Sequence, residues 1–87
     1  MPRFHFNVED GQPIPDPEGT VLPDIEAARR EAVRLAGRLL DDHPTEFWDR
    51  GEWCVVVTDD AGRDLFKLNF YASSADAPAV ATASAND

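Results

Sequence analysis

The sequence predicts an α+β fold, in which a small, mainly antiparallel sheet carries one amphipathic helix on one of its faces. Three observations support this prediction. Residues 22–43 repeat apolar side chains at the period of a helix, residues 3–8 alternate at the period of a strand, and residues 53–71 contain two strand-like runs separated by a turn. We expect the order strand, arm, helix, strand, strand. The sheet then has three strands, or four if Thr20–Leu22 also pairs with the first.

The first strand is expected at Arg3–Val8, where apolar and polar residues alternate. Asp10 and Gly11 mark a turn after it. The next segment, Gln12–Glu18, contains three prolines, which cannot donate to a central sheet ladder or continue a helix. We therefore expect an arm that runs over the surface.

The helix is the longest periodic segment of the chain. Asp24 precedes it and is a good N-cap, because its carboxylate accepts the free amides of the first turn. Pro44 disfavours helical geometry at the residue before it, so the helix should end at or shortly before His43. One stripe of the helix is apolar and should face the sheet, and its members are Ile25, Ala28, Ala32, Leu35, Ala36 and Leu39.

A β-hairpin is expected in the second half. Residues 45–48 are compatible with one short helical turn, and the strands follow at Trp53–Thr58 and Leu65–Tyr71, joined by a turn at residues 59–62. On the returning strand, one face carries Phe66, Leu68 and Phe70.

The outgoing strand, Trp53–Thr58, is apolar on both faces. A strand buried on one face should alternate, so this run indicates that something covers the second face as well. A single helix covers only one. The second cover would be the arm, the Phe47–Trp48 segment or another copy of the protein, and the sequence leaves these open.

Composition narrows the classes of function. The 87 residues suggest a single domain at 1–71, with residues 72–87 as a disordered tail. Cys54 is the only cysteine, which excludes an internal disulfide and fits a reducing compartment, and no apolar run reaches membrane-spanning length. We expect a cytoplasmic protein. The net charge of -9 disfavours direct binding to nucleic acid, which relies on basic residues.

The chain resembles a family of short bacterial proteins known as a domain of unknown function. The resemblance spans residues 2–71. In the first half it rests on Pro2-Arg3-Phe4, Phe6, Asp10-Gly11, Asp16, Glu18-Gly19, Leu22-Pro23-Asp24, Glu26-Ala27-Ala28 and Glu31-Ala32. In the closing hairpin it rests on Trp53, Val55, Val57, Asp59, Gly62-Arg63, Leu68 and Phe70. The resemblance implies a small cytosolic protein, and it implies no activity, ligand or catalytic residue.

Few residues suggest chemistry. If His5 and Cys54 met across the sheet, the imidazole would act as a general base for the thiol. A lone buried cysteine is more often inert. The acidic segment 10–24 contains carboxylates at Asp10, Asp16, Glu18 and Asp24 that would gather around a cation, but their spacing does not follow a calcium loop. We assign no catalytic residue, no metal ligand and no cofactor.

The aromatic and aliphatic residues that the helix leaves uncovered are the best candidates for a functional surface. The predicted interaction surface consists of Trp53, Val55, Val57, Leu65 and Tyr71. The preferred hypothesis is a non-enzymatic interaction or regulatory module whose partner is itself, as a homodimer, or another protein. The first alternative is a small acidic protein that binds a ligand or metal through residues 10–24. The second, from a weaker likeness in plan, is an antitoxin-like partner of an RNA-binding toxin.

Overall fold

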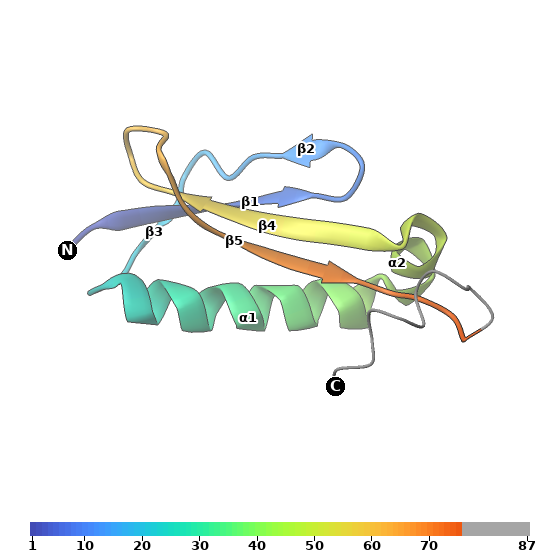
Figure 1. The fold of residues 1–87 in the computed structure, drawn as a ribbon. Coiled ribbons are helices and arrows are strands. Elements are labelled where there is room, and N and C mark those ends of the chain that lie inside the picture. The colour runs from blue at the N-terminus through green and yellow to red at the C-terminus, as the bar shows by residue number, and fades with distance from the viewer. Residues whose placement is uncertain (76–87) are drawn as a thin grey trace.

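A computed structural model describes residues 1–75 as a five-stranded antiparallel sheet with two helices. The elements in chain order are β1 (Arg3–Glu9), β2 (Pro13–Ile14), β3 (Thr20–Val21), α1 (Ile25–Asp42), α2 (Pro44–Arg50), β4 (Glu52–Thr58) and β5 (Asp64–Tyr71). Figure 1 shows α1 along one face of the sheet and α2 at the end where β4 begins. The predicted α+β class is confirmed. The short strand β2 is an addition to the predicted set of elements, and α2 stands where one short helical turn was predicted.

The strand order is β2-β1-β4-β5, and β3 also pairs with β1. β1 is joined to β4 along one side, with Phe6 opposite Val57 and Val8 opposite Val55. Along its other side, β1 pairs with β3 near its beginning and with β2 near its end. The pairing that we expected for Thr20 and Val21 is therefore present. β4 is a central strand, and β5 forms one edge of the sheet.

Helix α1 begins as predicted. The Asp24 carboxylate accepts the Ala27 N–H at 2.9 Å and caps the first turn. At the other end, the His43 N–H donates to the Leu39 carbonyl at 3.0 Å. Pro44 then starts α2 at a first-turn position, where its missing N–H would have no helical partner anyway.

Helix α2 is longer than the turn expected at residues 45–48, because it continues to Arg50. It ends at Gly51, which has a φ of 85°, a left-handed conformation that favours glycine. The Gly51 N–H donates to the Phe47 carbonyl at 2.7 Å. This tight end turns the chain directly from α2 into β4.

The core lies between α1 and the sheet. The helix presents a stripe of small side chains, Ala28, Ala32 and Ala36, which are 0%, 1% and 8% exposed. Because alanine ends at Cβ, this stripe lets the helix lie close to the sheet. Against it pack the buried residues Phe4, Phe6, Val8, Val55 and Val57, with Leu22, Ile25, Leu35, Leu39, Phe66, Leu68 and Phe70 around them.

An aromatic group closes the end of the core beside α2. Phe47 of α2 is buried, and its ring centroid lies 5.3 Å from that of Trp53 and 5.9 Å from that of Phe70. The Phe47–Trp53 pair is edge-to-face, a geometry that favours specific packing beyond the burial of area, and the Phe47–Phe70 pair is tilted. Phe47 therefore covers the same face of the sheet as α1. It does not supply the second cover that the two-sided strand suggested.

The opposite face of β4 is also partly buried. Val56 is 8% exposed although it points away from Val55 and Val57, and it lies opposite Asn7 of β1 and Lys67 of β5. A central strand has neighbours on both sides, which shield its residues even on the face without a helix. The apolar run of β4 thus follows from its central position.

All seven elements lie inside the predicted domain 1–71. The Ala72 N–H donates to the Gly51 carbonyl at 2.9 Å, just after β5 ends. Most of the predicted disordered tail, residues 76–87, lies outside the described residues, so that prediction stands as made. Over residues 1–75, neither helix combines the length and apolar character needed to cross a membrane.

Replacing Asp24 with alanine should lower the free energy of unfolding by about 1 kcal/mol, because the amides of the first turn lose their cap. Urea denaturation followed by circular dichroism measures the change. Asp41→Ala is the matched control, since Asp41 is an exposed aspartate near the other end of the same helix. Equal losses in the two variants would contradict a capping role for Asp24.

Candidate functional site

The five residues predicted to form one interaction surface lie on two different faces. Trp53, Val55 and Val57 are 4%, 0% and 0% exposed and face α1, so their placement on an uncovered surface was wrong. The reason is the register, which sets Val55 and Val57 beside the apolar face of β1. Leu65 and Tyr71 lie on β5 and are 41% and 69% exposed. Of the predicted surface, only these two residues of β5 are accessible.

The outer edge of β5 is open. β5 pairs with β4 along one side, and no other strand within residues 1–75 pairs with it. Its outer edge therefore presents a row of backbone N–H and C=O groups without sheet partners, an arrangement that readily accepts another strand. At eight residues, β5 is the longest strand of the sheet.

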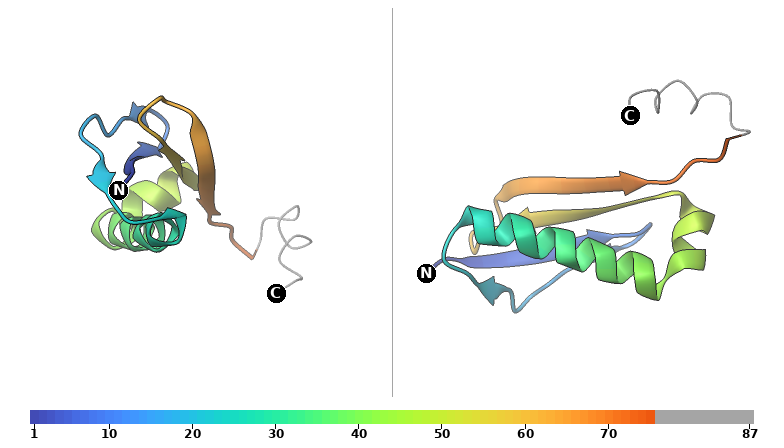
Figure 2. Two further views of the ribbon diagram at one scale, coloured as in Figure 1. Left: turned by 90° about the vertical axis from the view of Figure 1, so that its left-hand side faces the viewer. Right: turned by 90° about the horizontal axis from the view of Figure 1, so that it is seen from below.

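Apolar side chains flank this open edge on the helix side of β5. Phe66, Leu68 and Phe70 point toward the core but are only partly buried. Among the strands, β4 is the one that α1 approaches most closely. Figure 2, right, accordingly shows β5 alongside the helix rather than behind it. The helix thus leaves one side of this apolar row uncovered.

The opposite edge of the sheet is closed. Between β2 and β3, the arm is held to β1 by Asp16, whose carboxylate accepts the Phe6 N–H at 3.1 Å and the Gly19 N–H at 3.1 Å. The Asp16 N–H donates to the Asn7 side-chain oxygen at 2.9 Å. These bonds continue the edge pairing where the prolines interrupt it. The two edges of the sheet therefore differ sharply.

Three of the four carboxylates of the acidic segment 10–24 accept backbone amides in this fold, whereas Glu18 takes part through its backbone carbonyl, which accepts from the Arg3 side chain at 2.8 Å. Asp16 accepts two amides, Asp24 caps α1, and Asp10 accepts the Gln12 N–H at 3.4 Å. In the described part of the chain, no group of three acidic, histidine or cysteine residues is placed to hold a metal ion. The hydrogen bonds of these side chains explain their positions without a cation.

His5 joins three segments of the chain. Its Nδ1 lies 2.8 Å from the Asp16 carbonyl oxygen, and its Nε2 lies 2.7 Å from Asp60 Oδ1 in the turn between β4 and β5. Both partners are acceptors, so both contacts are hydrogen bonds only when both ring nitrogens carry a proton, as in the imidazolium form. The hydrogen bond to Asp60, followed by that to Asp16, raises the pKa of His5 above its ordinary value of 6.5.

The condition for a thiol and base arrangement, a contact between His5 and Cys54 across the sheet, is not met. The antiparallel register places His5 opposite Thr58 and Cys54 opposite Glu9. Cys54 Sγ donates to Glu9 Oε1 at 3.7 Å, and burial together with the Glu9 charge raises the pKa of the thiol. A protonated thiol is a weak nucleophile. Cys54 therefore lacks the lowered pKa that marks a nucleophilic cysteine.

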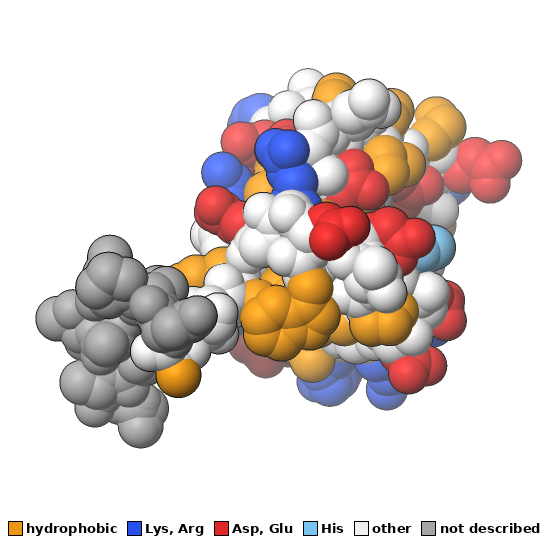
Figure 3. All heavy atoms as spheres, turned by 90° about the vertical axis from the view of Figure 1, so that its right-hand side faces the viewer, with side chains coloured by type: hydrophobic (Ala, Val, Ile, Leu, Met, Phe, Trp, Pro, Cys, Tyr) orange, Lys and Arg blue, Asp and Glu red, His pale blue; other side chains and the backbone are white. Residues whose placement is uncertain are grey.

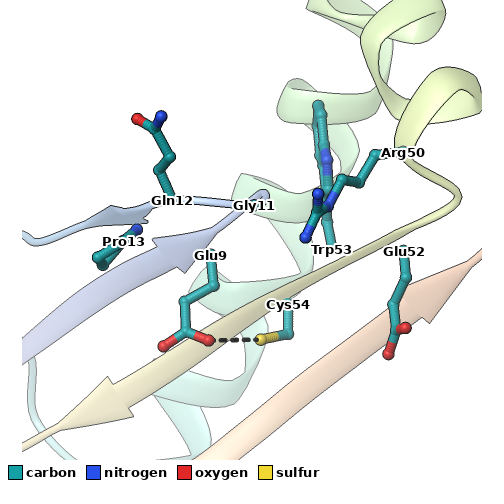
Figure 4. Close-up of a pocket in the computed structure, with 8 residues that line it drawn as sticks. All are labelled: Glu9, Gly11, Gln12, Pro13, Arg50, Glu52, Trp53 and Cys54. Atoms are coloured by element: carbon teal, nitrogen blue, oxygen red, sulfur yellow. Dashed lines mark hydrogen bonds between the residues drawn. The ribbon is translucent and has the colours of Figure 1, made fainter.

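Figure 4 shows a hollow of the surface, with Glu9 and Cys54 side by side and Arg50 extending toward Gly11. Its volume is about 470 Å³, and it lies where the turn after β1 meets the junction of α2 and β4. The residues around it are Glu9, Gly11, Gln12, Pro13, Arg50, Glu52, Trp53 and Cys54. The hollow is open and mostly polar, unlike the enclosed apolar pockets that hold most small ligands.

This end of the molecule, seen in Figure 3, mixes hydrophobic and acidic side chains. Trp48 of α2 is 62% exposed. The buried Trp53 is different, because its indole N–H has no hydrogen-bond partner among the described residues. A buried donor without an acceptor lowers stability, so the packing of Trp53 against Phe47 and Phe70 must offset that loss of stability.

With this geometry in view, the family can be stated. A model described as Domain of unknown function (DUF6894) matches residues 3–71, which include every strand and both helices. The chain belongs to this family. The resemblance seen in the sequence is thereby confirmed. Neither a curated protein nor a solved structure matches the chain.

The open edge of this DUF6894 domain was missed at the sequence level. Phe66, Leu68 and Phe70 were recognised as one face of a strand, but the strand order was not available to show that β5 is an edge. Lys67 is a sequence signal for an edge strand, because a lysine in the middle of a strand is a common feature of natural edge strands.

Replacing Trp53 with phenylalanine should change the unfolding free energy by less than about 1.5 kcal/mol, since it keeps an aromatic ring and removes an unpaired donor. Trp53→Ala should lower it by about 3–5 kcal/mol, because it leaves a cavity beside Phe47 and Phe70. Urea unfolding distinguishes the two. Equal losses would mean that the indole N–H finds an acceptor in solution.

The raised pKa of His5 predicts that the stability of the fold depends on pH. Because the folded state raises the pKa of His5 above 6.5, the bound proton stabilises the fold fully below pH 6.5. That contribution disappears as the pH rises through the raised pKa. Thermal melts from about pH 5.5 to about pH 8.5 should show this loss in the wild type.

In His5→Gln the same decline should be absent, and Asp60→Asn should reduce it because Asp60 is the largest cause of the shift. A decline of unchanged size in His5→Gln would assign the pH dependence to another group.

Proposed function

We propose that this domain is a non-enzymatic interaction module that self-associates through the open edge of β5. The observation that carries the proposal is the contrast between the two edges of the sheet. The β1 edge is paired with β2 and β3 and bridged by Asp16, whereas the eight-residue β5 edge has no strand beside it in the described part of the chain. Soluble domains usually protect such an edge; β5 carries Lys67 in mid-strand and an irregularity where it begins, but it is long and contains no proline.

The side chains of β5 support the same proposal. On the helix side, Phe66, Leu68 and Phe70 stay partly exposed, and Leu65 and Tyr71 are among the exposed large hydrophobic residues. A partner strand would cover this row, and a partner helix would close the side that α1 leaves uncovered. Tyrosine is also common among residues that dominate binding energy.

The size of the domain gives a second argument. Domains of this length bury a smaller fraction of their surface than larger ones, so their stability margin is narrow. A shared core between two copies adds burial without lengthening the chain. Because the second copy has the same sequence, it presents the same apolar residues, and a suitable register sets them opposite one another.

The charge of the chain modulates this association. Each copy carries a formal net charge of -9, so two copies repel at long range. Salt screens charges over about 10 Å at 0.1 M, so added salt should strengthen the association. A complex held by ion pairs would respond in the opposite direction.

Tyr71→Lys should weaken self-association by about tenfold or more, because it places a charge in the apolar contact. Light scattering over a concentration series measures the dissociation constant. Val33→Lys is the matched control, since Val33 is 62% exposed on α1, compared with 69% for Tyr71, and the charge change is equal. A wild-type chain that remains monomeric at all concentrations would refute the proposed function.

A further inference from the structure

The register of a strand pair decides which side chains meet. When two copies of one strand pair antiparallel about a two-fold axis, each residue faces a fixed partner, and directly opposite residues share a face of the sheet. If the axis passes through a residue, both copies keep their helices on the same face. An axis between two residues would set side chains of opposite faces directly across from each other, which a regular antiparallel ladder does not allow.

Three axes through the middle of β5 keep the faces matched, namely those at Lys67, Leu68 and Asn69. An axis at Lys67 sets two lysine ammonium groups directly opposite each other, which is unfavourable. An axis at Asn69 sets Phe66 opposite Ala72, which lies beyond the end of β5, so the aromatic ring meets only a methyl group.

The axis at Leu68 avoids both faults. It pairs Phe66 with Phe70 of the second copy, Leu68 with its own copy and Lys67 with Asn69. Aromatic pairs across strands are favourable, and no like charges are opposed. The exposed Tyr71 then lies next to Leu65 of the second copy, so the two most accessible apolar residues of β5 cover each other.

We infer that the domain forms a two-fold dimer in which β5 pairs antiparallel with β5 of a second copy about an axis at Leu68, joining two sheets into one. The inference rests on the proposed function and adds the partner strand and its register. The two α1 helices lie on the same face of the joined sheet. Between them, Phe66, Leu68 and Phe70 of both copies form one apolar strip, which fills the side of β5 that α1 leaves uncovered.

Disulfide trapping tests the register directly. Lys67→Cys and Asn69→Cys are each made in a Cys54→Ser chain, and one of the two carries a size tag. Lys67 and Asn69 are exposed, so the substitutions leave the core intact. Opposite residues in a strand pair lie about 4.5–5.5 Å apart at Cα, within the range of a disulfide, whereas diagonal neighbours are about 7–8 Å apart.

Under mild oxidation, a mixture of the Lys67→Cys and Asn69→Cys chains should give a strong cross-linked heterodimer. Each variant alone should give at least about tenfold less of its own dimer, since its thiols are diagonal neighbours. Circular dichroism melts confirm that both variants fold.

The alternatives give different results. Strong cross-linking of Lys67→Cys alone places the axis at Lys67, and strong cross-linking of Asn69→Cys alone places it at Asn69. Either result overturns the inference. If light scattering shows a dimer that Tyr71→Lys weakens but none of the three samples cross-links, the β5 edge still carries the association and the proposed function survives, whereas the antiparallel pairing about Leu68 is wrong. If the chain is monomeric and β5 binds only an extended peptide, both proposals fail.

Discussion

The contact between the alanine stripe of α1 and the central strand β4 is the constraint on which the rest of the structure depends. Ala28 and Ala32 are fully buried there, as are Val55 and Val57. A small core has little apolar area to spare, so the helix must lie where both sheet neighbours contribute side chains. Placed over β4, it covers the large residues of β1 and only part of those on β5.

The difference between the two edges of the sheet follows from the placement of α1 over β4. The chain enters α1 from β3, so residues 10–24 have to cross back along β1, and in doing so they close that edge. Prolines limit the pairing to short stretches, and Asp16 supplies the missing hydrogen bonds. β5 comes last in the sheet and has no comparable cover among the described residues. Its edge is therefore the one at which another strand can be added.

Much of the fold could be predicted from local chemistry. Asp24 as a helix cap, the three long strands and the brief pairing of Thr20 and Val21 depend on neighbouring residues and short periodicities. The interaction surface was harder to predict. The run from Trp53 to Thr58 is apolar on both faces, so alternation could not show which face meets the helix.

The sequence by itself determined the elements, the α+β class and the family, because propensity, capping and turn chemistry act over a few residues. Only the tertiary structure decided the strand order, the burial of Trp53, Val55 and Val57, and the separation of His5 from Cys54. These depend on register, and a shift of one residue moves every side chain to the other face. Register is fixed by the fit of whole surfaces, which no local pattern records.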